Sequence, residues 1–270
     1  TYLISNLMWN VNINVDSLRD HFLAKYYGVN RAQFIKQYMD TMTQALLQSK
    51  QVLNIYGFPV NAKNGYLSPD KIKYYQSLFA KAYAVLPFDY LDFEGAADLY
   101  NDRLRLLELP LDFAILDLSL TNLTPDLSFF SYENGKKVLN KAQMDRAEKF
   151  TQDCKRLDVD LLNENRYTPQ QYLEDIRNYV QKCTQPNKAA GKHVTCLTRW
   201  SEKYDAGGPQ ALTDGVCGIL NYNFNWLGFE GQNLDAIIDL DSIQNINEIS
   251  MDFYYCPLSW IFIPVRVTYY

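Results

Sequence analysis

The hydrophobic pattern of the chain changes its period at the segment TQPNKAAGK, residues 184–192. Before this segment, apolar residues recur every three or four positions, which is the spacing of helices with one buried face. After it come short β-branched and aromatic runs, HVTCLTRW, DAIIDL, INEISMDFYY and WIFIPVRVTYY, with turn-forming residues between them. The segment itself has little to bury, so it is the best domain boundary. We expect a multidomain α plus β fold, with an all-α helical domain over 1–183, a linker over 184–191 and a partial antiparallel β-sandwich over 192–270.

Start and stop signals divide the helical part further. Ser68–Pro69 and Thr168–Pro169 are pairs of a capping residue and a first-turn proline, whose missing N–H does no harm there. Pro110 lies inside an apolar helical pattern and predicts a kink or a break. We expect helices from Asn14 or Asp16 to Gly28, from about Phe34 to Leu46, from Pro69 onward, from Glu94 to about Leu120, over 140–157, and from Pro169 to about Cys183.

The composition excludes several classes of protein. At 270 residues and 47% hydrophobic, the chain can bury a sizeable core. Its 26 Lys and Arg face 31 Asp and Glu, and no basic run appears, so nucleic acid is not an expected partner. The most apolar stretch, LPLDFAILDLSL, contains two aspartates and is shorter than the roughly 20 residues that cross a bilayer, so no membrane span is expected. Five scattered cysteines without close spacing indicate neither a zinc site nor a disulfide framework.

Catalytic residues are not evident in the sequence. The two histidines, His21 and His193, leave little room for a nucleophile–histidine system. Asp89, Asp92 and Glu94 form an acidic group of the kind that glycoside hydrolysis uses, but they precede a helix, where the helix dipole favours negative charge. We therefore predict no catalytic residue in this chain.

The stretch 201–240 carries the candidate binding residues. Its Asp-Gly turn at Asp214, preceded by ALT, can bring backbone carbonyls and a carboxylate around a hard cation such as calcium, although a plain tight turn is the alternative. Tyr222 and Trp226, together with Trp260 further on, can offer flat faces to a sugar ring, although aromatic residues of a small sandwich also form its core.

The same region resembles a known family. The segments ALTDG, NYNFNWLGFEG, IIDLDSIQNINEISMDF and PLSWIFIPVRVTYY resemble the N-terminal half of a discoidin-like (coagulation factor 5/8 type C, galactose-binding-like) domain, of the variant appended to bacterial glycoside hydrolases. The resemblance covers about 192–270 and implies a partial jelly-roll sandwich that binds carbohydrate. By analogy, a structural Ca²⁺ would take the Asp214 side chain and the Ala211 carbonyl as ligands.

The helical part carries a second resemblance. YLISNLMWNVNINVDSLRDHFLAKYYG and NIYGFPVNAKNGYLSP resemble the segment that follows the barrel in DUF4838 proteins, which are predicted bacterial hydrolases related in outline to α-glucuronidases and hexosaminidases. The resemblance covers roughly 1–183 and is strongest in the first 80 residues. In such proteins the catalytic carboxylates lie at the C-terminal ends of barrel strands, and none of those strands falls in this sequence. The resemblance therefore implies an enzyme for the parent protein and not for this segment.

Both ends of the sequence look interrupted. TYLISNLMWN already has the apolar spacing of a helix and lacks an initiator Met, and SWIFIPVRVTYY resembles a strand from the middle of a sandwich. We interpret the chain as part of a longer protein. The inner faces of the truncated sandwich are then expected to be uncovered at Ile237, Ile249, Phe253, Trp260 and Phe262. A continuation of the chain, a second copy of the chain or the helical domain would have to cover them, and we favour the continuation.

The favoured function is that of a non-catalytic C-terminal accessory region of an exported glycoside hydrolase acting on polysaccharides, periplasmic or at the cell surface. Its expected partners are a glycan or polysaccharide and the catalytic (β/α) barrel of the same polypeptide, which the helical domain supports. The alternative is a surface glycan-binding or adhesion protein without enzymatic activity. A βα-repeating pattern upstream of Thr1 would favour the enzyme. A helical interaction scaffold would leave the discoidin resemblance unexplained.

Overall fold

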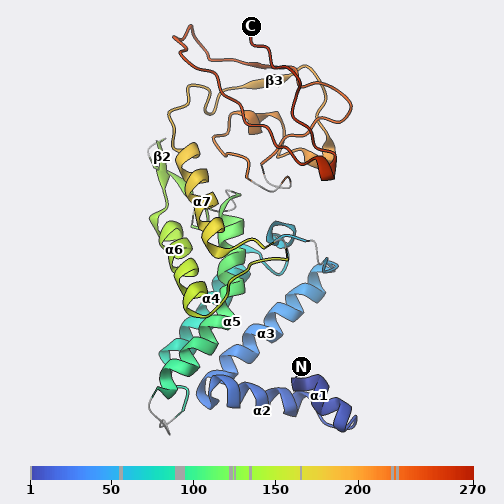
Figure 1. Cartoon of the computed structure of the whole chain (residues 1–270), viewed down its shortest axis with the longest axis vertical. Coiled ribbons are helices and arrows are strands. Elements are labelled where there is room, and N and C mark those ends of the chain that lie inside the picture. Colours follow the sequence, from blue (N-terminus) through green and yellow to red (C-terminus); the bar gives the residue numbers. More distant parts are fainter. Residues whose placement is uncertain are drawn as a thin grey trace. The chain divides into compact units, whose positions relative to one another are not determined.

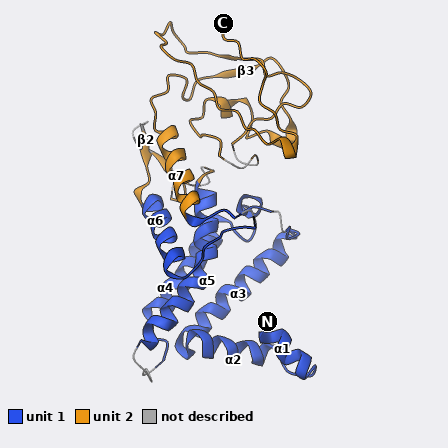
Figure 2. Ribbon diagram, viewed as in Figure 1, with its two compact units in different colours: residues 1–119, 142–169 blue, residues 120–141, 170–270 orange. Residues whose placement is uncertain are grey.

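The computed structural model describes residues 2–54, 57–88, 95–121, 124, 126–133, 136–164, 166–219, 222 and 225–270. Seven α-helices and two small antiparallel sheets lie in these ranges (Figure 1). The chain divides into two compact units, which we describe separately (Figure 2). Unit 1 comprises residues 1–119 and 142–169, and unit 2 comprises residues 120–141 and 170–270.

Unit 1 is helical. Its helices are α1 (Tyr2–Trp9), α2 (Val15–Tyr27), α3 (Val29–Ser49), α4 (Pro69–Ala84), α5 (Ala96–Ser119) and α6 (Lys141–Arg156), with a short 3₁₀ helix at Pro59–Ala62. Helix α3 packs against α2 and α4, and α5 contacts both α2 and α4. The predicted helices therefore exist with bounds close to those expected.

The predicted helix signals act as expected at the ends of α2 and α4. The Asn14 side chain accepts a hydrogen bond from the Ser17 amide at 2.8 Å, which confirms Asn14 as the N-cap. Gly28 ends α2 at φ +99°, and a Cβ there would lie 2.4 Å from the Pro87 Cβ, so the turn into α3 requires glycine. Pro69 occupies the first turn of α4, as its sequence predicts.

Helix α2 buries Leu18, Leu23 and Tyr27. Phe22 and Tyr26 are half-buried and stack on each other with centroids 5.2 Å apart. The core of unit 1 is made by residues of α2 to α6. Its largest fully buried side chains are Leu23, Ile35, Ile72, Tyr75, Leu78, Leu104, Ile115, Leu116, Leu118 and Phe150.

Helix α5 continues through Pro110 without a break. The proline removes one backbone donor, but the residues on either side of it, Leu109 and Leu111, are both buried. Packing of this apolar face against other helices therefore outweighs the lost hydrogen bond, since tertiary burial supplies most of the stability of a helix in a protein.

Unit 2 contains helix α7 (Pro169–Cys183, apart from its first residue) and two two-stranded antiparallel sheets. Strands β1 (Phe130–Glu133) and β2 (Lys136–Leu139) form one sheet, within the region that the sequence assigned to helices. Strands β3 (Val194–Cys196) and β4 (Ala236–Ile238) form the other, at two of the predicted β runs. The predicted linker, 184–191, follows α7 inside this unit. Three short 3₁₀ helices lie at Glu202–Tyr204, Pro209–Leu212 and Pro257–Ser259.

The predicted strands in INEISMDFYY and WIFIPVRVTYY are wrong for this chain. Residues 240–270 form no strand beyond a single bridge between Cys256 and Ile261, and the described residues form no sandwich or jelly roll. A strand forms where a neighbour satisfies its backbone groups, and no described strand lies beside these runs. The five side chains that were expected to be uncovered are exposed, although no sandwich face is formed by the described residues. The exposed fractions of Ile237, Ile249, Phe253, Trp260 and Phe262 are 55, 52, 39, 86 and 62%.

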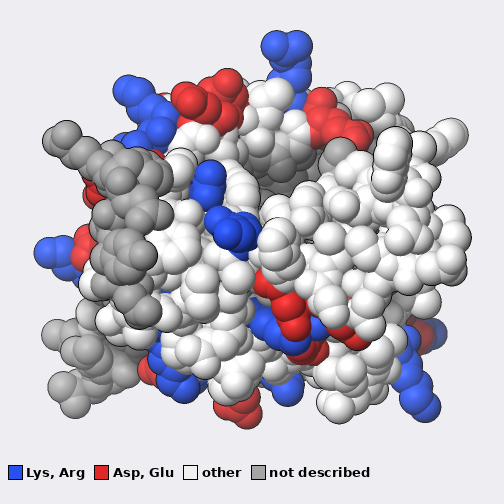
Figure 3. All heavy atoms as spheres, turned by 90° about the horizontal axis from the view of Figure 1, so that it is seen from below, with Lys and Arg blue, Asp and Glu red and all other residues white. Residues whose placement is uncertain are grey.

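The surface charge is mixed. On the face drawn in Figure 3, Lys and Arg side chains alternate with Asp and Glu, and neither sign forms a continuous field among the residues drawn in blue, red and white. Within the described ranges, no helix has the length and apolarity needed to cross a membrane.

Candidate functional site

Unit 2 contains an open hollow of about 380 Å³, which we call the 199–232 hollow. Two segments frame it, residues 199–203 after strand β3 and residues 230–232 before strand β4. The side chains that line it combine one indole with charged and amide groups. They are Arg199, Trp200, Ser201, Glu202, Lys203, Glu230 and Gln232.

The backbone holds these two segments side by side beyond the β3–β4 pair. The Leu197 amide donates to the Asp235 carbonyl at 2.8 Å, which extends the pairing by one residue. Further on, the Ser201 amide donates to the Gly228 carbonyl and the Gly228 amide donates to the Tyr204 carbonyl, both at 2.8 Å. A Cβ at Gly228 would lie 2.8 Å from the Tyr204 Cβ, so this close approach requires glycine.

The polar groups of the hollow are fixed by local contacts. The Arg199 guanidinium donates to the Glu202 carboxylate, and the Gln232 side-chain amide donates to the Arg199 carbonyl. Ser201 is buried, and its hydroxyl accepts a hydrogen bond from the Lys203 amide at 3.2 Å. Hydrogen-bonding residues therefore share the lining of the hollow with one half-buried tryptophan, Trp200. The hollow thus offers one aromatic residue and several hydrogen-bonding groups in an open, mostly polar lining.

A cluster of aromatic rings adjoins the hollow. The Lys203 ammonium, which lines the hollow, lies 5.1 Å from the centroid of the Tyr204 ring. Tyr204 is 6.1 Å from Tyr222, and Tyr254 lies 6.3 Å from Tyr222 and 5.4 Å from Trp226, all between ring centroids. The structure thus brings together two of the predicted sugar-binding residues, Tyr222 and Trp226.

Trp226 and Trp260 differ in their surroundings. The Trp226 indole N–H donates to the Ile219 carbonyl at 2.7 Å, and the ring packs directly on Gly218, where a Cβ would lie 2.3 Å away. Trp260 is 86% exposed, adopts a left-handed φ of +58°, and takes part in no ring pair with another described residue. The structure therefore does not bring Trp260 into the aromatic cluster.

The turn proposed for calcium already has a cation beside it. Asp214 accepts a hydrogen bond from the Val216 amide at 2.7 Å, which forms an Asx turn. The Lys137 ammonium donates to the Gly215 carbonyl of the same turn. No group of three or more His, Cys, Asp or Glu side chains that could hold a metal ion occurs within the described residues. The two proposed ligands, the Asp214 carboxylate and the Ala211 carbonyl, supply fewer oxygens than the 6 to 8 that calcium takes. The assignment of Asp214 and Ala211 as ligands stays a prediction.

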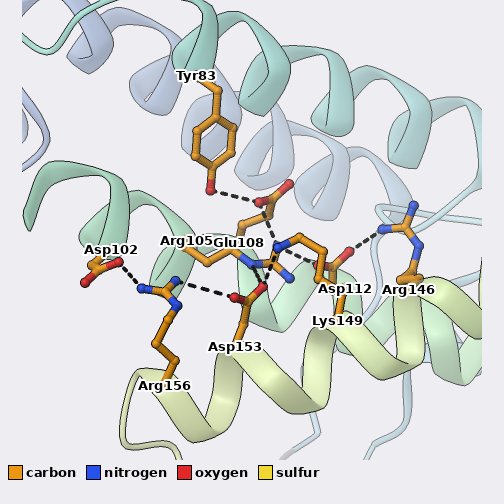
Figure 4. A network of polar contacts seen from close by, with 9 residues as sticks. All are labelled: Tyr83, Asp102, Arg105, Glu108, Asp112, Arg146, Lys149, Asp153 and Arg156. Atoms are coloured by element: carbon orange, nitrogen blue, oxygen red, sulfur yellow. Dashed lines mark hydrogen bonds and ion pairs between the residues drawn. The ribbon is translucent and has the colours of Figure 1, made fainter. Parts of the chain in front are cut away.

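Unit 1 contains a buried ionic network centred on Arg105 of α5 (Figure 4). The Arg105 Nε donates to Asp153 at 2.7 Å, and its Nη1 lies 2.8 Å from Glu108 and 2.6 Å from Asp112. Burial acts to raise the pKa of Asp153, but hydrogen bonds from Lys149 and Arg105 outweigh it and lower that pKa. Asp153 is therefore ionised at neutral pH.

The outer members complete the charge balance of this network. Arg146 pairs with Asp112, Arg156 with Asp102, and Lys149 with Asp153 at 2.9 Å (Figure 4). Four carboxylates thus meet four cations. A glycosidase needs one carboxyl that stays protonated and one that stays free to attack, and these paired carboxylates fit neither role. We interpret the network as a clamp between α5 and α6.

Asp117 is the buried acid that lies outside this network. Burial raises its pKa from 3.8 to about 7, and its Oδ2 has no hydrogen-bond partner within the described residues. Asp112 precedes it by five residues on α5, so the two side chains point about 140° apart around the helix. They do not form a pair of carboxylates facing one substrate.

The remaining candidate catalytic residues are the two histidines and the acidic group at 89–94. His21 is exposed, and its Nδ1 lies 3.4 Å from the Tyr2 hydroxyl. His193 is exposed, and its Nε2 lies 3.4 Å from the Thr195 hydroxyl. The acidic group at 89–94 lies outside the described residues.

Comparison with known proteins gives one match. The model of the family described as "Domain of unknown function (DUF4838)" matches residues 1–40, which span α1, α2 and the first half of α3. The match supports the predicted DUF4838 resemblance over this stretch. No curated protein and no solved structure gives a significant match to the chain.

The sequence did not reveal the residues that give the hollow its shape. Trp200 ends the run HVTCLTRW, which was interpreted as a strand, yet β3 ends at Cys196. Tyr204 and Tyr254 join the aromatic cluster from segments 50 residues apart, so their proximity has no local signal. A tryptophan between Arg199 and Ser201, directly after a short strand, was the one cue that could have indicated a binding loop.

Proposed function

We propose that the chain is a non-catalytic accessory region of an exported glycoside hydrolase acting on polysaccharides, and that unit 2 binds a glycan at the 199–232 hollow. The observation that carries this proposal is the placement of Trp200 among Arg199, Glu202 and Gln232, beside the aromatic cluster. A sugar ring has one apolar face and a rim of hydroxyls. An indole with donors and acceptors around it complements both parts.

The balance of charge at the hollow favours a neutral ligand. Arg199 pairs with Glu202, and Lys203 and Glu230 contribute one charge of each sign. An anionic or cationic polymer would gain no net attraction from such a lining, whereas hydroxyl groups can donate to the carboxylates and accept from the cations. We therefore expect uncharged polysaccharides to bind better than uronic acid polymers.

Unit 1 is proposed to support the catalytic (β/α) barrel of the same polypeptide. The support lies in the stretch matched by the DUF4838 model, where α1 has no buried residue. Ile4, Met8 and Trp9 on this helix are 63, 82 and 93% exposed. Apolar side chains gathered on one exposed helix are typical of a surface that packs against another domain.

Three further parts of the proposal rest on the resemblances to discoidin-like domains and DUF4838 proteins. They are the sandwich fold of unit 2, the calcium ion and the export of the protein. Unit 2 is proposed to belong to a discoidin-like sandwich whose remaining strands would cover the apolar side chains of residues 240–270. A structural calcium ion at Asp214 and Ala211, and export to the periplasm or the cell surface, belong to the same proposal. The alternative is a surface glycan-binding or adhesion protein, which would use the same hollow without a catalytic domain.

Two assays on the 270-residue chain test the proposal. In affinity electrophoresis through gels that contain neutral polysaccharides, at least one polymer should retard the chain relative to a gel without polymer. Aryl glycosides and glucuronides should not be hydrolysed, because the two-carboxylate site belongs to the barrel. Turnover that one Asp or Glu substitution within the chain abolishes would contradict the non-catalytic assignment.

A further inference from the structure

Two cysteines of unit 2 meet although they lie 34 residues apart in the sequence. Cys183 is the last residue of α7 and is buried, and Cys217 follows the turn at Asp214 and is half-buried. The Cys217 amide donates to the Cys183 sulfur at 3.2 Å, and the Cys217 thiol also hydrogen-bonds that sulfur. Both are free thiols.

The groups around Cys183 favour its thiolate. The hydrogen bond from the Cys217 thiol, the nearby Lys137 ammonium and the Tyr179 hydroxyl lower the pKa of Cys183 to about 7 against the opposing effect of burial. The Lys137 ammonium is held close because it donates to the Cys183 carbonyl at 3.1 Å. The thiolate of Cys183 in turn raises the pKa of Cys217, so Cys183 is the thiol of the pair that ionises first.

We propose that Cys183 and Cys217 are a redox-active pair that forms a reversible disulfide, which fastens the segment 209–217 to the end of α7. The 3.2 Å contact of the Cys217 amide with the Cys183 sulfur shows that the folded chain already brings the two residues together. The inference goes beyond glycan binding and does not depend on it.

The other cysteines lack this arrangement. Cys154 is fully buried in unit 1, and burial raises the pKa of its thiol to about 11. Cys196 is half-buried, and burial raises the pKa of its thiol. Cys256 has the Ser259 hydroxyl as its neighbour at 3.4 Å and no second thiol.

The oxidation balances with a small disulfide as the oxidant. The Cys183 thiolate attacks one sulfur of the oxidant and expels the other sulfur as a thiolate. Cys217 then gives its proton to the expelled thiolate, attacks the Cys183 sulfur of the mixed disulfide and expels the second sulfur of the oxidant as a thiolate. Cys183 and Cys217 together lose two electrons, and the oxidant gains them as its sulfur–sulfur bond breaks.

Peptide mapping of the intact chain tests the pairing directly. The folded chain is equilibrated with oxidised glutathione, quenched with acid, alkylated under denaturing conditions and digested without reduction. We expect one cross-linked peptide pair, joining Cys183 to Cys217, while Cys154, Cys196 and Cys256 are alkylated. After equilibration in concentrated urea, the same oxidant should give at least tenfold less of this cross-link, because the pairing depends on the fold.

Variants provide the matched comparison. Cys217→Ser should abolish the cross-link and leave Cys183 alkylated or joined to glutathione, and Cys196→Ser should retain the cross-link in full. The peptide map of the unsubstituted chain tests for the Cys183–Cys217 disulfide even if a variant does not fold. The inference is overturned when Cys183 and Cys217 both remain alkylatable at oxidised glutathione, when each carries its own glutathione, or when another pairing dominates.

Discussion

Arg105 and Asp153 form a buried ion pair that joins α5 to α6, with the Arg105 Nε 2.7 Å from the Asp153 Oδ2. The Arg105 side chain is 9% exposed, and so is that of Asp153. Removing one partner of such a pair leaves an uncompensated charge in a poorly solvated place, which costs more than the pair itself contributes.

Arg105→Met is therefore expected to lower the free energy of unfolding by about 3–5 kcal/mol. Three carboxylates around the guanidinium, Glu108, Asp112 and Asp153, would lose their shared cation. Urea unfolding followed by circular dichroism measures the change. The matched control is Lys149→Met, because the Lys149 side chain in the same network is 66% exposed and its ion pair is worth less than about 1 kcal/mol. Equal losses for the two variants would contradict the assignment of Arg105 as the centre of the clamp.

Asp117 is expected to make unit 1 less stable as the pH rises. Its pKa is raised from 3.8 to about 7 in the folded chain, so the folded state binds a proton that the unfolded state has released. Stability from this group is greatest below about pH 4 and falls as the pH rises through about 7, by at most about 4 kcal/mol. Asp117→Asn should therefore match the parent near pH 4 and exceed its unfolding free energy at pH 8.

The control for this prediction is Asp160→Asn, since Asp160 is an exposed carboxylate of the same unit. Urea unfolding curves at pH 4, 6 and 8 compare the three proteins. A parallel pH dependence for the parent and Asp117→Asn would show that Asp117 is ionised throughout this range.

Gly28→Ala is expected to destabilise the chain more than Gly95→Ala. Both glycines have a positive φ, +99° and +80°, but a Cβ at Gly28 would lie 2.4 Å from the Pro87 Cβ, whereas no atom of the described residues lies within 4 Å of a Cβ at Gly95. We expect losses of roughly 3 kcal/mol for Gly28→Ala and about 1–2 kcal/mol for Gly95→Ala. Thermal unfolding of the two variants measures the difference, and equal losses would mean that the clash with Pro87 is relieved.

Calcium binding, if it follows the resemblance, depends on Asp214. Titration calorimetry of the chain with calcium should give a signal that Asp214→Ala abolishes, because the remaining ligands are neutral carbonyls. Lys137→Met is the informative second variant, since its ammonium donates to the Gly215 carbonyl of the turn. Removing that cation should strengthen calcium binding. A calcium signal that survives Asp214→Ala would overturn the assignment.

Local signals made most of the helices predictable. Asn14 and Pro69 act at the starts of α2 and α4 within the first turn of each helix, so the local sequence predicts them, whereas the close approach of Gly28 to Pro87 depends on tertiary packing. The β1–β2 hairpin was missed although Asn134–Gly135, a frequent hairpin dipeptide, stands between its strands in the sequence.

The strands expected over 246–255 and 260–270 were wrong because β propensity describes a side chain that fits a sheet and does not supply the neighbouring strand.

The candidate site was predictable only where its residues are close together in the sequence. Tyr222 and Trp226 are close in sequence and were identified, whereas Trp200 and the Cys183–Cys217 pair depend on contacts between distant segments. Such contacts follow from tertiary packing, which periodicity and spacing do not encode.

Glycan binding at the 199–232 hollow is the central claim, and titration calorimetry with the polysaccharide that best retards the chain tests it most directly. Trp200→Ala should weaken binding at least tenfold with an unchanged unfolding temperature, because the indole lines the hollow. Trp260→Ala should bind as the parent does, since that ring is 86% exposed and outside the aromatic cluster. Unchanged affinity for Trp200→Ala, or a loss confined to Trp260→Ala, would contradict the account.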